Sequence, residues 1–308
     1  MGGFCRLFYS ETIGEIIMKI LVFDIGGTEI KYALCDGNFN LTEKKSVPTN
    51  AYEGGKRIIE RIVETVKTFD GVDRIGISTA GQVDSEKGMI VYATDSIPGY
   101  TGTQIKSIVE AETGIPCAVE NDVNSAALGE AFFGAAKGEK NFICLTYGTG
   151  IGGAIFLDGK LFKGCGCSAG EFGHFVTHAG GKDCTCGGKG CYEAYASSGA
   201  LVRAVAEKTG RSLNGREIFA EFDNPEIRSI IDAWIDEIVV GLKGLVYIFN
   251  PSLVVAGGGI MNEKYITDEI NKRLQNQLMQ SFRCVRVEKA LMGNDANLLG
   301  AACIASEI

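Results

Sequence analysis

Two glycine turns, each set between two predicted strands, constrain this chain more than any other feature. The segment FDIGGT at 23–28 ends one apolar strand and opens the next, and LTYGTGIGGA at 145–154 repeats that arrangement. Elsewhere predicted strands alternate with predicted helices, which is typical of an α/β protein. The recurrence therefore predicts two related α/β halves that face each other across a cleft.

The other predicted elements follow from the spacing of apolar residues. The predicted helices cover residues 55–69, 103–113, 123–134 and 224–249, and a last helix begins near Asp295. The predicted strands include 74–80, 116–122 and 252–259. The chain after residue 193 is expected to be mainly helical.

Charge and cysteine content limit the class of protein. The net charge of −8 disfavours a nucleic-acid partner, because proteins that bind nucleic acid are normally basic. Eleven cysteines are an odd number, and most stand singly in apolar surroundings, as reduced core thiols do. We therefore expect a reducing, cytoplasmic location. No apolar run reaches the roughly 18 residues that span a bilayer, so no membrane partner is expected.

Three glycine runs at strand ends are candidates for phosphate binding, because such turns expose backbone N–H groups without side chains in the way. The runs are Gly26-Gly27-Thr28, Gly148-Thr149-Gly150 and Gly257-Gly258-Gly259. Asp24 precedes the first run and is placed to orient a water or Mg²⁺. Any one run alone is more simply an ordinary tight turn. Three runs without a Walker lysine motif or a Rossmann fingerprint indicate a different nucleotide-binding fold.

Glu120, Asn121 and Asp122 end a predicted strand, where an α/β sheet presents residues to its cleft. A carboxylate there can take the proton from an attacking hydroxyl, as phosphoryl transfer to an alcohol requires. The alternative is that Asp122 or Asn121 only caps the helix that follows. The chain has two histidines, so if His174 binds a metal, only His178 remains as an imidazole base. A carboxylate base is therefore favoured.

The segment EFGHFVTHAGGKDCTCGGKGCYE at 171–193 contains a closed set of metal ligands. His174, Cys184, Cys186 and Cys191 supply one nitrogen and three sulfurs, the ligand set of a structural zinc site. Disulfides are disfavoured in a reducing compartment, and the redox motif Cys-x-x-Cys is absent. Cys165 and Cys167 form a second Cys-x-Cys, which we interpret as unliganded thiols, with alternative ligands left open. His178 is expected at the surface or beside the metal ligands.

In combination these motifs resemble the ROK family (repressors, open reading frames and sugar kinases). Its fold is the two-lobed actin-like ATPase fold, which is ribonuclease H-like and has a cleft between the lobes. The resemblance runs from about residue 19 to the end of the chain. It is carried, in chain order, by DIGGT, END, LTYGTGIGGA, EFGH, CTCGGKGCYE and VVAGGGI.

The resemblance implies an ATP-dependent sugar kinase that transfers the γ-phosphate to the 6-hydroxyl of a hexose or N-acylhexosamine. Glucose and N-acetylmannosamine are the first sugars to consider. ATP, Mg²⁺ and a structural Zn²⁺ are the implied cofactors, and a homodimer or homotetramer is the implied assembly.

Residue roles carry over from the family motifs position by position. Asp122 matches the catalytic base, and His174 would bind zinc through one ring nitrogen and face the sugar with the other. The residues expected to bind sugar are Gly81, Asn121, Asp122, Glu171, His174 and Glu193. The residues expected to bind the nucleotide are Asp24, Gly26, Gly27, Thr28, Gly148, Thr149, Gly150, Gly257 and Gly258.

Two departures from the family pattern leave the identity of the sugar open. The loop before the END strand reads TDSIPGYTG, with Ser96 and Tyr100, where related glucokinases often have Asn-Leu followed by Trp. Tyr147 stands where a small aliphatic residue is common.

The predicted small lobe comprises residues 19–122 and 296–308, and the predicted larger lobe comprises 123–295 with the zinc segment. Residues 1–18 lack the features of a signal peptide. They are expected to be an extension of little structural weight, because Met18-Lys19 directly precedes the first predicted strand. The alternative function is a sugar-responsive ROK regulator without its DNA-binding domain, disfavoured because only 23 residues precede Asp24. A chaperone-like or filament ATPase of the same fold would not need the zinc segment.

Overall fold

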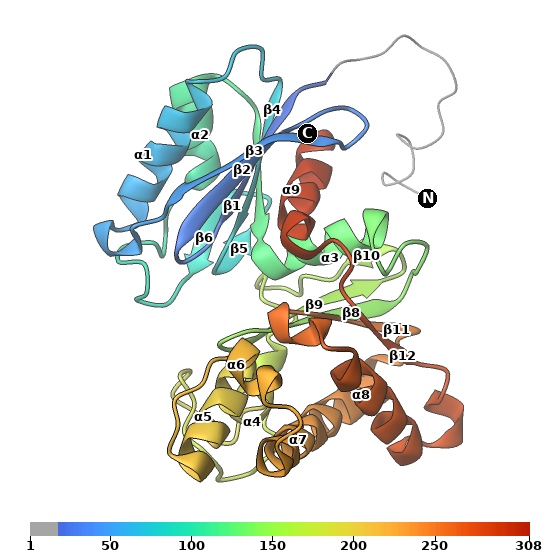
Figure 1. Ribbon diagram of the computed structural model, residues 1–308. Coiled ribbons are helices and arrows are strands. Elements are labelled where there is room, and N and C mark those ends of the chain that lie inside the picture. The colour runs from blue at the N-terminus through green and yellow to red at the C-terminus, as the bar shows by residue number, and fades with distance from the viewer. Residues whose placement is uncertain (1–17) are drawn as a thin grey trace.

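The computed structural model describes residues 18–308, which form two lobes, each built on one five-stranded sheet (Figure 1). Apart from Met18, the predicted N-terminal extension lies outside these residues. In the part of the chain that the structure describes, no helix is both long and apolar enough to cross a bilayer.

The first sheet has the strand order β3-β2-β1-β4-β7. Its strands are β1 (Ile20–Ile25), β2 (Glu29–Cys35), β3 (Leu41–Pro48), β4 (Arg74–Thr79) and β7 (Cys117–Asn121). It is covered by α1 (Gly55–Val66), α2 (Ile105–Thr113) and α9 (Ala296–Ser306). Alternate residues of β1 face opposite sides, since Leu21 and Phe23 pack in the core with α1 and α2, whereas Ile20 and Val22 pack with α9. Burial on both faces explains why β1 is apolar almost throughout.

The second sheet has the strand order β10-β9-β8-β11-β12. Its strands are β8 (Phe142–Tyr147), β9 (Ile151–Leu157), β10 (Lys160–Leu161), β11 (Leu253–Gly257) and β12 (Arg286–Lys289). One face packs on α3 (Asp122–Phe133), and the other packs on α5 (Ser198–Thr209), α7 (Pro225–Phe249) and α8 (Lys264–Gln277). Two shorter helices, α4 (Glu193–Ala196) and α6 (Gly215–Ala220), complete this lobe.

The two sheets share one topology. In each, the central strand pairs antiparallel with the next strand in a hairpin and parallel with a later strand, β4 in the first sheet and β11 in the second. A second antiparallel and a second parallel neighbour complete both sheets. The repeat of two glycine turns therefore belongs to a larger structural repeat, and the prediction of two related α/β halves is confirmed.

Helices α3 and α9 cross in close contact because a glycine occupies each side of the crossing. A Cβ atom added at Gly129 would lie 2.3 Å from the Ala296 carbonyl oxygen. One added at Gly300 would lie 1.9 Å from the Ser125 carbonyl oxygen. Since α9 packs on the first sheet and α3 on the second, this crossing joins the two lobes (Figure 1). The predicted domain boundaries remain predictions.

Sequence reasoning missed the edge strands β3 and β12 and a separate two-stranded sheet. That sheet is the hairpin of β5 (Gln82–Asp84) and β6 (Met89–Tyr92), which follows β4. The glycine run after β11 leads into a 3₁₀ turn at Gly259–Asn262 before α8 begins.

Candidate active site

A cleft of about 790 Å³ is lined by segments of both lobes and brings together most of the predicted site residues. The predicted residues that line it are Gly81, Asn121, Asp122, Gly148, Gly150, Glu171, His174, Cys186, Glu193 and Gly258. The predicted residues outside its lining are Asp24, Gly26, Gly27, Thr28, Thr149, Gly257, Cys184 and Cys191. The cleft thus gathers the residues predicted for sugar and only part of those predicted for nucleotide.

Asn121, rather than Asp122, caps helix α3. Its Oδ1 accepts hydrogen bonds from the backbone N–H groups of Val123 at 2.9 Å and Asn124 at 3.0 Å. Its Nδ2 donates to the Gly81 carbonyl and to Asp122 Oδ1, both at 2.9 Å. The cap therefore orients Asp122, which lies in the first turn of α3 and lines the cleft.

The pKa of Asp122 is raised to about 6, first by burial of the carboxyl group and second by the negative charge of Asp24. Hydrogen bonds from the Val123 backbone and the Asn121 side chain oppose the shift. A carboxylate with this pKa is still mostly ionised at neutral pH, yet it holds a proton better than an exposed aspartate does. Both properties suit a general base.

Asp24 is the second-last residue of β1, its charge acts on Asp122, and two neighbours hold its side chain. Ser78 Oγ donates to its Oδ1 at 3.1 Å, and Asn297 Nδ2 donates to the same atom at 2.9 Å. Burial raises the pKa of Asp24, and these two hydrogen bonds lower it. Because Asn297 belongs to α9, the end of β1 is tied to the helix at the lobe crossing.

The first glycine turn, 26–28, connects β1 to β2. The Gly26 N–H donates to the Glu29 carbonyl at 3.1 Å, and Thr49 Oγ1 donates to the Gly26 carbonyl at 2.6 Å. Gly27 and Thr28 are exposed. The turn is thus fixed at its base and open at its tip, as binding through backbone N–H groups requires.

The second and third glycine runs lie against each other. The Gly148 N–H donates to the Gly150 carbonyl at 3.0 Å in the turn between β8 and β9. Gly258 has φ +109°, and a Cβ atom there would lie 2.3 Å from the Tyr147 carbonyl oxygen. Position 258 therefore requires glycine both for its conformation and for this close approach.

Tyr147 links the second glycine turn to the segment that carries the predicted metal ligands. Its ring is buried, and its hydroxyl lies 3.0 Å from the hydroxyl of Tyr192, which donates to the Ile238 carbonyl at 2.9 Å. Tyr192 stands between Cys191 and Glu193 in the sequence. The unusual tyrosine thus fills the core of the second lobe and does not line the cleft.

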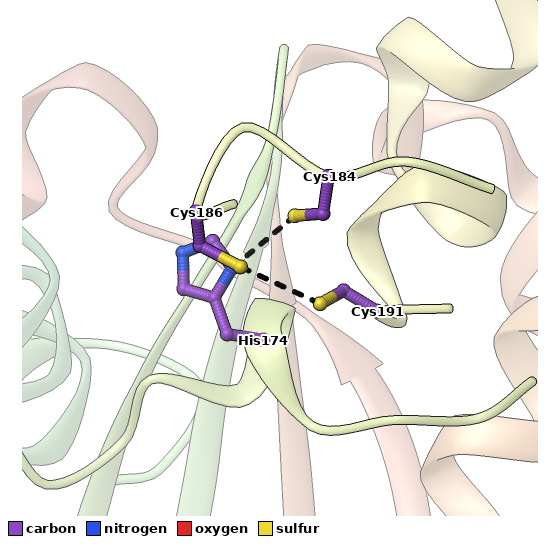
Figure 2. Close-up of side chains that lie close together, drawn as sticks. All are labelled: His174, Cys184, Cys186 and Cys191. Atoms are coloured by element: carbon purple, nitrogen blue, oxygen red, sulfur yellow. Dashed lines mark hydrogen bonds between the residues drawn. The ribbon is translucent and has the colours of Figure 1, made fainter. Parts of the chain in front are cut away.

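The four predicted zinc ligands converge on one point (Figure 2). Their ligand atoms all lie within 4.8 Å of one another, with His174 Nδ1 3.6 Å from Cys184 Sγ and Cys186 Sγ 3.6 Å from Cys191 Sγ. Sulfurs bound to one tetrahedral zinc at about 2.3 Å lie about 3.8 Å apart, whereas a disulfide bond is about 2.0 Å long. The donor set and its spacing therefore fit zinc, which remains a prediction.

Glu193 and Glu171, which are predicted to bind sugar, are held by different neighbours. Glu193 Oε1 accepts hydrogen bonds from Cys184 Sγ at 3.2 Å and from Thr185 Oγ1 at 3.0 Å. This side chain is therefore held by the cysteine loop, residues 184–191. Glu171 is exposed, and its Oε1 accepts from Gln82 Nε2 at 3.3 Å. His174 faces Cys184 through Nδ1, so Nδ1 is the atom placed to bind the metal and Nε2 is free of that role.

Sequence reasoning missed much of the remaining cleft wall. The added lining residues include Gln82, Tyr92, Thr94, Ile97, Cys167 and Ser168. The one feature of the sequence that pointed to this wall was the unusual loop TDSIPGYTG, residues 94–102. Ser96 of this loop lines the cleft, and its Oγ lies 2.8 Å from Thr94 Oγ1. Tyr100 of that loop is buried, with its hydroxyl 2.7 Å from Thr79 Oγ1.

Cys165, Cys167 and the second histidine lie outside the ligand cluster. Cys165 is exposed, and Cys167 lines the cleft. His178 stacks on Tyr195 at a ring distance of 4.0 Å, and its Nε2 is 3.5 Å from Glu237 Oε2. This position beside the cysteine loop agrees with the expectation for His178.

Comparison with known proteins decides the family, because the ROK family model matches residues 20–308. The chain belongs to the ROK family. It is 35% identical to a β-glucoside kinase of Listeria monocytogenes over 291 residues, which cover 92% of this chain and 96% of the relative.

Solved structures of ROK proteins have the same fold. A ROK hexokinase from Thermus thermophilus matches with a TM-score of 0.82 at 35% identity, covering 94% of this chain and 98% of the other. A ROK glucokinase from Streptomyces griseus, in complex with glucose and AMPPNP, matches with a TM-score of 0.81 at 31% identity. That match covers 94% of this chain and all of the other. The predicted two-lobed actin-like fold is confirmed.

Proposed function

We propose that this protein transfers the γ-phosphate of ATP to the 6-hydroxyl of a hexose or N-acylhexosamine, with Asp122 as the general base. One observation carries the proposal. The Asp122 carboxylate, whose pKa is raised to about 6, lies at the start of α3 directly after β7, in a cleft that it shares with a glycine turn and with Glu171 and Glu193.

The assignment to the carbohydrate kinases is based on the similarity to known sugar kinases. The chain is an ATP-dependent carbohydrate kinase of the ROK family, since it matches sugar kinases over nearly their whole length, one of them bound to an ATP analogue. Those relatives are named for different substrates, which supports a sugar without selecting one.

In the proposed reaction Asp122 accepts the proton of the attacking sugar hydroxyl. Asn121 holds Asp122 in place through its cap on α3. Carboxylates of Glu171 and Glu193 can accept hydrogen bonds from ring hydroxyls, and His174 Nε2 adds a contact. Such contacts fix the orientation of the reacting hydroxyl, which supplies much of the catalysis in phosphoryl transfer.

The nucleotide is proposed to lie along the glycine turns. Backbone N–H groups of 26–28 and 148–150 would hold phosphate oxygens, and the run 257–259 would face the nucleoside. Asp24 is placed to orient Mg²⁺ bound to ATP. The zinc proposed for the cysteine cluster would be structural, because three cysteines and one histidine leave no open position.

A coupled assay of ADP release tests this proposal. Purified protein with Mg²⁺ and zinc is given ATP and, in turn, glucose, N-acetylmannosamine, N-acetylglucosamine, mannose, fructose, allose and a β-glucoside. We expect ADP release that depends on one or a few of these sugars. ADP release without sugar would favour an ATPase, and no release with any sugar would count against the proposal.

A further inference from the structure

Lys163 and Glu120 form an ion pair between the two lobes. Lys163 follows β10 of the second sheet, and Glu120 lies in β7 of the first sheet, two positions before Asp122. The Lys163 Nζ atom lies 2.5 Å from Glu120 Oε2. The Glu120 side chain is fully buried, whereas that of Lys163 is partly exposed. Neither residue lines the cleft.

Glu120 also organises the backbone that carries the predicted base. Its Oε1 accepts hydrogen bonds from the Asn121 N–H at 2.9 Å and from Asn124 Nδ2 at 3.0 Å. Within the described residues its Oε2 has no hydrogen-bond partner apart from the Lys163 ammonium group, so Lys163 is the group that balances this buried charge. A buried carboxylate that loses its cation is strongly unfavourable, which makes the pair matter to the local structure.

Lys163 makes two further contacts that anchor the loop leading to Glu171. Its Nζ donates to Ser85 Oγ at 2.6 Å, just after β5 of the first lobe. Its carbonyl accepts from the Ala169 N–H at 3.1 Å, which closes the loop 163–169. This loop contributes residues 167–169 to the cleft wall. The Lys163 side chain therefore connects this loop to the first lobe, in addition to the contact between Gln82 and Glu171.

We propose that Lys163 is a positioning residue that holds the loop 163–171 against the first lobe, so that Glu171 and Asp122 face the same sugar. This inference rests on the proposed function. Lys163 acts through Glu120 and the loop and does not touch the reacting atoms. Its loss should therefore weaken sugar binding much more than ATP binding.

Steady-state kinetics of Lys163→Met and Lys163→Arg test the proposal, with Lys160→Met as the matched control. Lys160 is an exposed lysine on β10, three positions away. We expect Lys163→Met to raise the KM for sugar by about 10-fold to 100-fold and to change the KM for ATP by less than about twofold. Lys163→Arg should recover most of the loss because arginine keeps the charge, and Lys160→Met should behave as wild type. An unchanged KM for sugar in Lys163→Met would overturn the proposal.

A double variant separates positioning from folding. Lys163→Met leaves a buried carboxylate unpaired, and adding Glu120→Gln removes that charge. We expect the double variant to regain thermal stability relative to Lys163→Met, whereas its KM for sugar stays raised because the loop is still untied. A double variant with the wild-type KM for sugar would show that the effect was on stability alone and would refute the positioning role.

The same variants distinguish failure of this inference from failure of the proposed function. If the wild-type protein phosphorylates no sugar, the proposed function fails. Thermal unfolding of Lys163→Met, of the single variant Glu120→Gln and of the double variant still measures the coupling between Lys163 and Glu120. Coupling in that cycle supports the bridge between the lobes, and strictly additive effects overturn it.

Discussion

Asp122 lies where burial and a neighbouring charge both oppose its ionisation. Asp24 at the end of β1 shares this environment, and burial raises the pKa of both carboxyl groups. Two aspartates so close together gain from a bound cation, which would lower the cost of keeping both ionised. This agrees with the proposal that Mg²⁺ accompanies ATP near Asp24.

The pH dependence of the reaction follows from the pKa of Asp122. A general base must be deprotonated, so kcat/KM for sugar should fall as the pH drops below about 6. The free energy of unfolding should change in the opposite direction and rise as the pH falls from about 6 towards 3.8. The reason is that the pKa of Asp122 is higher in the folded state than its unfolded value of 3.8, so protonation favours the folded state. A pH–rate profile checks the first statement, and a rate that stays constant down to pH 5 would contradict it.

Replacing Asp122 by asparagine should remove the base and keep the fold. We expect kcat to fall by about 10²-fold to 10⁴-fold, the range typical of general base catalysis. Sugar affinity by calorimetry should be retained, and the melting temperature should not fall, because an unfavourable buried charge is removed. Asp223→Asn, at an exposed position, is the control and should have wild-type kcat. Wild-type activity in Asp122→Asn would exclude Asp122 as the base.

At the scale of elements, the cysteine loop holds residues predicted to contact the sugar. His174 and Glu193 both lie within hydrogen-bond range of Cys184. The loop can therefore act on sugar binding through the position of these two side chains, without taking part in the chemistry.

Cys184→Ser should lose zinc and sugar affinity together. Removing one of four ligands weakens the metal site, and the loop that positions His174 and Glu193 then loses its constraint. Metal content per chain and the KM for sugar are the measurements, and we expect the KM to rise by about 10-fold or more. Cys165→Ser is the control, because Cys165 lies outside the ligand cluster. A metal-free Cys184→Ser protein with normal sugar affinity would contradict this coupling.

The sequence predicted correctly those features that depend on residues close together in the chain. The buried strand β1, the amphipathic helix α1 and the ligand spacing of the cysteine loop all depend on residues near one another in the sequence. The ion pair between Lys163 and Glu120 could not be predicted in this way, because it exists only after the two lobes have packed. The alternative that Asn121 or Asp122 caps α3 was similarly open, since only geometry shows that Asn121 is the cap while Asp122 faces the cleft.

At the scale of the whole molecule, the two lobes meet where α3 crosses α9. Asp122 lies at the start of α3, and Asn297 at the start of α9 binds Asp24. Two of the predicted acidic residues of the site, Asp122 and Asp24, are thus connected to the two crossing helices. The spacing of these helices should therefore affect how Asp122 and Asp24 are placed relative to each other.

Gly300→Ala should disturb this geometry, because its Cβ atom would overlap the Ser125 carbonyl oxygen of α3. We expect the free energy of unfolding to fall by about 1–3 kcal/mol, the usual cost of overpacking. Thermal or denaturant unfolding measures the effect. Gly166→Ala is the matched control, because a Cβ atom there meets nothing within 4 Å. Equal stability of the two variants would show that the crossing tolerates a wider spacing.

Identification of the reaction product tests the central claim most directly. The protein is incubated with Mg²⁺, ATP and the sugar that supports ADP release, and the products are analysed by ³¹P nuclear magnetic resonance. The account predicts one sugar phosphate per ADP, with phosphorus coupled to the protons on carbon 6, and its formation should be about 10²-fold to 10⁴-fold slower with Asp122→Asn than with the wild type. Inorganic phosphate as the sole product besides ADP would contradict it.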